Sequence, residues 1–254
     1  MARLRPVRHD EHLSIVEHLD ELRSRLIVAG LSFVVAFGLA FWQKGPLLRI
    51  ANDPLGGRKP ITLAPAEAFM TTVTVAAYAA LLLALPVILY QLYAFVLPAF
   101  SPAERRVALP LLVMVPVLFI GGAVFAYFVV LPPALKFLLN FDANNFHTMV
   151  RARDYYGFVG LTTISVGILF QVPVAILALT RLGIVTPRQL RRTRRYAILV
   201  IAVLAALLPS VDPVSMLIEM APLIVLYELS ILLASAFGRP SPDVAERVAS
   251  AESS

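Results

Sequence analysis

The sequence predicts an all-α, polytopic membrane protein with six transmembrane helices and both termini in the cytoplasm. Three observations support this fold class: the composition, six apolar runs, and the distribution of lysine and arginine. Hydrophobic residues make up 59% of the 254 residues and charged residues only 15%, against about 45–50% and about 25% in soluble domains. A soluble chain has too little polar surface to cover that much apolar area, whereas a bilayer accepts it.

Four of the apolar runs are long enough to cross a bilayer. A span needs about 20 mostly apolar residues to cross roughly 30 Å of hydrocarbon. None of these four runs contains an aspartate, glutamate, lysine or arginine in its interior. We expect these spans at residues 26–42, 69–97, 107–131 and 156–180.

The last two apolar runs are a closely spaced pair with a short first member. The fifth run, 196–208, holds 13 residues and as a helix would reach only about 20 Å at 1.5 Å per residue. Thinning of the bilayer or tilted neighbours would have to absorb this mismatch. The breaker cluster 209–213, Pro-Ser-Val-Asp-Pro, separates it from the sixth run, 214–237. We expect two short spans, with a single re-entrant hairpin as the alternative.

The basic residues predict the orientation. With the N-terminus inside, the inner segments hold 15 of the 22 lysines and arginines and the outer segments hold 7, which places both termini in the cytoplasm. The inner loop 181–195 alone carries six arginines. Between two apolar spans, such a stretch indicates a topology anchor near anionic lipid rather than a nucleic-acid site.

The same patterns divide the chain into three regions. Residues 1–25 form a cytoplasmic segment whose apolar residues recur at helical spacing, which predicts an amphipathic helix. Residues 26–237 form the six-helix transmembrane domain, in which the Pro- and Gly-rich outer loop 43–68 is expected to be structured. Residues 238–254 are rich in Ser, Pro and Glu, and we expect a disordered cytoplasmic tail.

The sequence offers little for catalysis. It contains no His-Glu-x-x-His zinc motif, no Gly-x-Ser-x-Gly elbow and no Gly-rich phosphate loop followed by lysine. It has no cysteine, which excludes a Cys-ligated metal site, and its four histidines lie outside the expected spans. We therefore expect no enzymatic activity, no cofactor and no metal.

Two carboxylates are expected at the inner edge of the membrane. Glu21 lies in the amphipathic segment, and Glu104 lies in a short inner loop. Carboxylates at this place could each hold a guanidinium by paired hydrogen bonds, a geometry that suits arginine and not lysine. Such a pair would recognise two arginines in a ligand. The alternative is local ion pairing, with Glu21 bound to Arg25 one helical turn later.

Polar residues inside the spans are the third class of candidate. Gln171 needs a partner in the membrane, either a neighbouring helix or a backbone carbonyl freed by Pro173. Glu219 and Glu228 are nine residues apart in the sixth run, so they lie on nearly opposite helix faces and are not expected to share one ion. Because a carboxylate in a span is a functional candidate, a small-solute secondary transporter coupled through Glu219 or Glu228 is the alternative function.

Residues 18–26 read His-Leu-Asp-Glu-Leu-Arg-Ser-Arg-Leu. This series resembles the opening motif His-Leu-x-Glu-Leu-Arg-x-Arg-Leu of the TatC family, the multi-spanning core subunit of the Sec-independent twin-arginine protein translocase. Further motifs of the family are matched in order by residues 86–95, 104–106, 126–130, 133, 183–187 and 190–191. The likeness runs from about residue 12 to residue 236. Each motif is weakly specific, but their order across six spans is strongly specific.

The resemblance implies a function. TatC proteins receive folded preproteins that carry a twin-arginine signal peptide, and they recruit single-span partners of the TatA and TatB type for export driven by the proton motive force. By this likeness we expect a multi-subunit complex in the bacterial cytoplasmic (inner) membrane, in contact with lipid and not with nucleic acid. A scaffold that binds partner helices through Gln171 but no signal peptide is a further alternative.

The resemblance also implies the site residues. The positions that match the signal-peptide-binding surface of the family are Glu21, Glu104, Arg23, Phe95, Arg105 and Arg106. The positions that the resemblance assigns to partner helices or to structure are Gln171, Pro54 and Asp212. We add Glu228 to this group because it is a carboxylate inside the sixth run. Two departures stand out. Gln171 replaces what is commonly a glutamate, and one proline rather than two adjacent prolines precedes Asp212.

Overall fold

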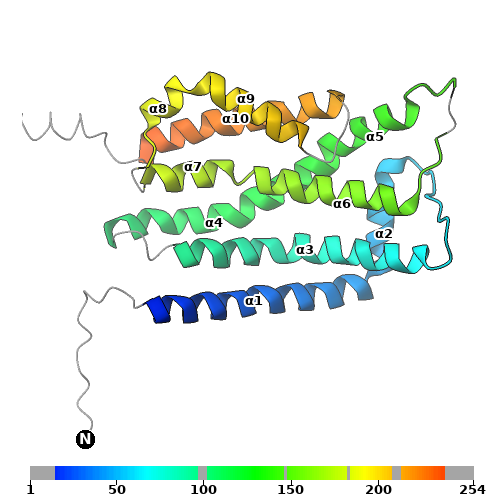
Figure 1. Ribbon diagram of the computed structural model, residues 1–254, viewed down its shortest axis with the longest axis horizontal. Coiled ribbons are helices and arrows are strands. Elements are labelled where there is room, and N and C mark those ends of the chain that lie inside the picture. The colour runs from blue at the N-terminus through cyan, green and yellow to red at the C-terminus, as the bar shows by residue number, and fades with distance from the viewer. Residues whose placement is uncertain (1–14, 97–101, 146–147, 182–183, 208–212, 238–254) are drawn as a thin grey trace, which may run out of the picture.

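The computed structural model describes residues 15–96, 102–145, 148–181, 184–207 and 213–237. Side chains are described for residues 19–95, 113–145, 148–180, 184–207 and 213–235. Within these residues the regular structure is helical and no β-strand occurs, apart from an isolated bridge between Ile61 and Arg151. Long helices lie side by side as a bundle, with shorter helices at its two ends (Figure 1). The all-α prediction is confirmed.

Helices α1 (Ile15–Trp42) and α3 (Glu67–Val96) contain the first two expected spans. Residues 15–25 continue α1 without a break, so the amphipathic segment and the first span are one helix. The two helices approach through small side chains, Ala36 of α1 with Ala80 and Ala84 of α3. Most large apolar side chains of α1 remain exposed on the chain, as expected for a helix that faces lipid.

The third expected span is part of a longer helical stretch. Helix α4 (Pro102–Phe125) passes through a π-helical turn, η3 (Ala126–Val130), directly into α5 (Leu131–Asn140). Two prolines at the start of α5 lack an N–H donor, so the regular hydrogen-bond ladder cannot continue there. A wider π-helical turn is a common way to accommodate such a defect.

The fourth expected span is split into α6 (Ala152–Leu169) and α7 (Val172–Arg181). The break falls at residues 170–171 because Pro173 has no N–H to donate to the carbonyl of Leu169. The prediction of a helical segment at 156–180 is therefore right in place, but the segment is interrupted.

The C-terminal part contains α8 (Pro187–Arg192), α9 (Arg194–Ala206) and α10 (Pro213–Phe237). A capping box starts α8, in which Thr186 and Gln189 exchange side-chain and backbone hydrogen bonds. Helix α9 has 13 residues, which corresponds to about 20 Å. A core of buried residues from α4, α7, α9 and α10 joins these helices; it includes Val115, Val174, Leu177, Ile201, Leu223 and Ile231.

Five helical stretches of the described chain are long and apolar enough to cross a membrane. They are Leu19–Trp42, Glu67–Phe95, Val113–Asn140, Ala152–Thr180 and Pro213–Ser235. Helix α9 is too short to be one of them, because a full span takes about 20 residues. The fifth expected span, 196–208, therefore stays a prediction, and so do the total of six spans and the orientation.

The loop between the first two spans is structured. Helix α2 (Lys44–Asn52) runs across the end of the bundle, as Figure 1 shows, and leads into a single 3₁₀ turn, η1 (Asp53–Leu55). Gly56 and Gly57 then turn the chain with φ angles of 60° and 89°, a region that glycine enters without steric cost. The resulting end cap, residues 44–57, packs against α3 and α6.

Candidate functional site

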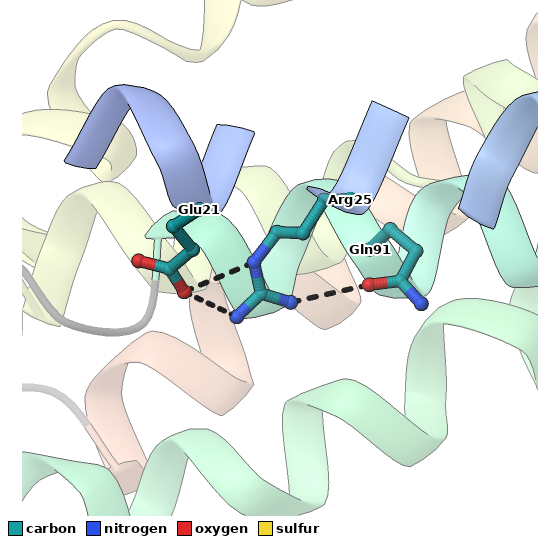
Figure 2. Close-up of polar contacts among 3 residues, drawn as sticks. All are labelled: Glu21, Arg25 and Gln91. Carbon is teal, nitrogen blue, oxygen red and sulfur yellow. Dashed lines mark hydrogen bonds and ion pairs between the residues drawn. The ribbon is translucent and has the colours of Figure 1, made fainter. Parts of the chain in front are cut away.

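The N-terminal part of α1 and the C-terminal part of α3 carry a triad of polar side chains. Glu21 and Arg25 lie one turn apart on α1, and Gln91 lies on α3 (Figure 2). Arg25 Nε donates to Glu21 Oε1 at 3.0 Å, and Arg25 Nη2 donates to the same oxygen. Arg25 Nη1 donates to Gln91 Oε1 at 3.2 Å. The local ion pair that the sequence offered as the alternative role of Glu21 is therefore present, and Gln91 extends it to the neighbouring helix.

The two charged side chains of the triad are partly exposed. The side chain of Arg25 is 24% exposed and that of Glu21 is 27% exposed. Next to Arg25 and Gln91 lies a small apolar groove between α1 and α3, with a volume of about 130 Å³. Its apolar lining consists of Leu22, Leu26, Ala29, Ile88, Leu92 and Phe95. A carboxylate, a guanidinium and an apolar groove therefore meet at one place.

The structure describes only some side chains of the other residues predicted to bind a signal peptide. Phe95 lines the groove beside the triad, whereas Arg23 is exposed on α1. Residues 104–106 lie in the first turns of α4, and their side chains are outside the described residues. The start of α4 and the start of α1 are at the same end of the bundle (Figure 1). The backbone thus brings Glu104 to the end of the molecule that carries Glu21.

The side chain of Gln171 is buried between helices of the bundle. Its side chain is 7% exposed, and Nε2 donates to the backbone carbonyl of Val115 on α4 at 3.1 Å. Oε1 is buried and has no hydrogen-bond partner among the described residues. The amide thereby ties the break between α6 and α7 to α4. Its predicted contact with a partner helix stays a prediction.

Glu228 and Pro54 make contacts within the chain. Glu228 Oε2 accepts a hydrogen bond from Arg194 Nη2 at 2.8 Å, which joins α10 to the start of α9. Pro54 lies in the turn η1 of the end cap. Asp212 is outside the described residues. Glu219 is 2% exposed inside α10, far along the helix from Glu228, so the structure does not bring these two carboxylates together.

A second ion pair, which joins the start of α3 to the residue before α6, could not be predicted from the sequence. Arg151 Nε donates to Glu67 Oε1 at 2.7 Å, and Leu63 N donates to Glu67 Oε2 at 2.8 Å. The hydrogen bond between Arg151 and Glu67, together with the negative charge of Glu67, raises the pKa of the Arg151 guanidinium. The pair links residues 84 positions apart, and the only sequence signal was that both lie at outer ends of expected spans.

Three tyrosine hydroxyls form hydrogen bonds to the end cap of residues 44–57. Tyr127 Oη donates to the carbonyl of Ile50 at 2.7 Å, and Tyr155 Oη donates to that of Ala51 at 2.6 Å. Tyr156 Oη donates to Asn52 Oδ1 at 2.9 Å. The last carbonyls of a helix lack intrahelical partners, so these hydroxyls satisfy the end of α2. The cap is therefore held to η3 and α6 by directional bonds as well as by packing.

Comparison with known proteins decides the family. A sequence model described as TatC, Sec-independent protein translocase protein, matches residues 17–222. The chain belongs to the TatC family. A TatC protein of Carboxydothermus hydrogenoformans is 35% identical over 241 residues, covering 94% of this chain and 99% of that protein. TatCy of Bacillus subtilis is 36% identical over 231 residues, covering 88% of this chain and 89% of that protein.

Solved structures agree with this membership. A crystal structure of the twin-arginine translocase receptor TatC in DDM aligns with a TM-score of 0.75 and 35% identity, covering 88% of this chain and all of that one. A second crystal structure of the TatC receptor aligns with a TM-score of 0.71 and 35% identity. The protein is thus a multi-pass membrane component of the Sec-independent protein translocase. Among the described residues, no group of His, Cys, Asp and Glu is arranged to hold a metal ion.

Proposed function

We propose that this TatC protein binds the twin-arginine signal peptides of folded preproteins at its cytoplasmic end, through Glu21 and Glu104. The observation that carries this proposal is that Glu21, close to the apolar groove, already holds a guanidinium. Two N–H groups of Arg25 converge on one of its oxygens. This contact is the local ion pair that the sequence offered as the alternative role of Glu21, and it supports the proposal because a guanidinium can reach the carboxylate at this place. Lysine, as a point charge, cannot reproduce this two-donor contact.

The surroundings of Glu21 suit a signal peptide. Such a peptide carries an apolar segment after its basic residues. The apolar groove that contains Phe95 begins next to Arg25, so it can take apolar side chains while Glu21 takes a guanidinium. Glu104 lies at the same end of the bundle (Figure 1) and supplies the carboxylate for a second arginine in this proposal, with Arg23, Arg105 and Arg106 as its neighbours.

We place this end of the bundle in the cytoplasm of a bacterial cell and propose six spans, with α9 as the fifth. The excess of lysine and arginine in the segments at this end supports the orientation. Single-span TatA- and TatB-type proteins assemble on the outer, lipid-facing surfaces of the spans in this proposal. The short α9 is a place where the bilayer would be locally thin, which suits export driven by the proton motive force.

The two alternatives from the sequence fit the structure less well. A small-solute transporter was expected to be coupled through Glu219 or Glu228. Glu228 is bound to Arg194 at the start of α9, and Glu219 is 2% exposed inside α10, nine residues away, so the two do not form a shared ion site. A scaffold that acts only through Gln171 would need an outward-facing amide, whereas this one is 7% exposed. Membership of the translocase family also favours protein export.

Cross-linking tests the binding proposal. A photoreactive twin-arginine signal peptide and a twin-lysine control are incubated with the full-length protein in mild detergent. We expect labelling by the arginine peptide alone, reduced at least tenfold by Glu21→Gln with Glu104→Gln, because each lost charge-assisted contact contributes about 1.5–3 kcal/mol. Asp20→Asn is the matched control, since it removes a neighbouring exposed charge. Equal labelling by both peptides, or full labelling of the double variant, contradicts the proposal.

A further inference from the structure

Glu21 is already engaged by a guanidinium of its own chain. Arg25 uses Nε and Nη2 to contact the same Glu21 oxygen. This is the kind of two-donor contact that a carboxylate makes with an arginine of a bound ligand. An arginine from a peptide must therefore compete with Arg25 for the carboxylate, unless the two share it at the cost of placing two positive charges side by side.

Arg25 has a second acceptor on another helix. Its Nη1 donates to Gln91 Oε1 at 3.2 Å. Figure 2 shows Glu21 and Gln91 on opposite sides of the guanidinium. Arg25 can therefore leave Glu21 and keep a hydrogen bond to α3. After this release Gln91 is its remaining acceptor in the triad, so this bond matters more in the released state than in the paired state.

We propose that Arg25 is an internal competitor for the signal-peptide site. It occupies Glu21 in the empty receptor, yields the carboxylate to a peptide arginine while Gln91 holds it nearby, and returns when the peptide leaves. This inference rests on the proposed function, because it takes Glu21 as an acceptor for the peptide. It explains how a partly buried carboxylate, 27% exposed, keeps a cationic partner in both states, since an uncompensated buried charge is costly.

The competitor lowers affinity by a defined factor. Partly exposed pairs of this type favour the paired state by about 2- to 5-fold. The apparent affinity falls with the fraction of molecules in which the site is available. Arg25 therefore weakens peptide binding by about 3- to 6-fold. The factor is the same for every ligand that must displace Arg25, so the preference for arginine over lysine comes from Glu21 and not from Arg25.

The test compares peptide affinities of Arg25 variants of the full-length protein in mild detergent. The probes are a fluorescent synthetic peptide with two adjacent arginines before an apolar segment and its twin-lysine counterpart, read by anisotropy. Arg25→Gln should lower Kd by about 3- to 6-fold for both peptides. Arg25→Lys keeps the charge and the stem but loses the two-donor contact, so it should fall between Arg25→Gln and the unmodified protein. Monodisperse elution confirms that each variant is folded.

Arg192→Gln is the matched control for net charge. Arg192 is an exposed residue at the end of α8, at the end of the bundle where α1 begins. Its substitution removes one positive charge and leaves the triad unchanged. We expect its Kd to stay within about 1.5-fold of the unmodified value, because exposed charges far apart are screened at physiological salt. A decrease in Kd as large as that of Arg25→Gln would overturn the competitor proposal in favour of a general charge effect.

Gln91→Leu provides a readout that a purely structural role would not give. In the unmodified background it should weaken peptide binding, because the released Arg25 loses its remaining acceptor in the triad. In the Arg25→Gln background it should have no effect on binding. Equal weakening in both backgrounds overturns the role given to Gln91, since the glutamine would then act independently of Arg25.

The outcomes separate this inference from the proposed function. If the unmodified protein binds both peptides equally and Glu21→Gln changes nothing, the proposed function fails. If binding prefers arginine and depends on Glu21, but Arg25→Gln leaves Kd unchanged or raises it, only the internal competitor fails.

Discussion

Gly122 lies at a close approach between α4 and α6, and it allows a sharp test of the packing. A Cβ atom at Gly122 would lie 2.9 Å from the Cα of Gly167 and 2.8 Å from the Cγ of Phe170. The Gly167 atom belongs to the backbone and cannot rotate away, so the two helices would have to separate. Membrane helices rely on such small residues, because lipid gives them little hydrophobic drive to associate.

The expected effect follows from two opposing contributions. Forcing a methyl group into a packed interface costs about 1–3 kcal/mol, while replacing a helical glycine with alanine gains about 1 kcal/mol. At neighbouring Gly121 a Cβ would meet nothing within 4 Å, so Gly121→Ala keeps the gain without the clash. Gly122→Ala should therefore be less stable than Gly121→Ala by about 1–3 kcal/mol. At about 2–4 °C per kcal/mol for a chain of this size, their midpoints should differ by about 2–12 °C.

The assay is the loss of monodisperse protein on heating in one detergent at one heating rate. A fixed rate matters because membrane proteins often unfold irreversibly, and an apparent midpoint then depends on the rate. The comparison between adjacent glycines removes differences in expression, detergent and helix propensity. Equal midpoints for Gly122→Ala and Gly121→Ala would refute the close approach of α4 and α6.

Three further predictions concern the ion pair between Glu67 and Arg151, the end cap of residues 44–57, and the membrane topology of the chain. A double-mutant cycle tests the pair between Glu67 and Arg151. Glu67→Gln and Arg151→Gln together should lower thermal stability by less than the sum of the two single losses, because either change alone already breaks the pair. Additive losses would mean that the two residues do not interact. Tyr155→Phe should cost about 1 kcal/mol through its lost hydrogen bond to the cap, whereas Tyr90→Phe, on an exposed side chain, should be nearly neutral in the same assay. The chain has no cysteine, so Ser210→Cys can be labelled selectively, and we expect a membrane-impermeant maleimide to reach it from outside intact cells; protection from the reagent would favour a re-entrant hairpin.

The spans were predictable because each depends on a continuous local pattern. The first four expected runs and the sixth, 214–237, each overlap a helical stretch that is long and apolar enough to cross a membrane. The 13-residue length of the fifth run reappears in α9. The ion pair between Glu21 and Arg25 was also predictable, because residues four apart on a helix face each other.

The boundaries and interruptions were less predictable. Hydropathy marks where a helix is apolar and not where its backbone stops being helical, so α1 begins eleven residues before the expected span at Leu26. The break before Pro173 and the π-helical turn before Pro132 depend on how freed backbone groups are accommodated. A proline in a span indicates a defect, but it does not specify the form that the defect takes.

The sequence by itself determined the class of protein, the approximate spans, the resemblance to TatC and the location of charged residues at the helix ends. Only the tertiary structure decided which distant polar residues meet: Arg25 with Gln91, 66 positions apart, and Glu67 with Arg151, 84 positions apart. The same holds for the inward direction of Gln171. The physical reason is that a helix fixes relations only between residues within about one turn, whereas distant side chains meet according to how whole helices dock and rotate against each other.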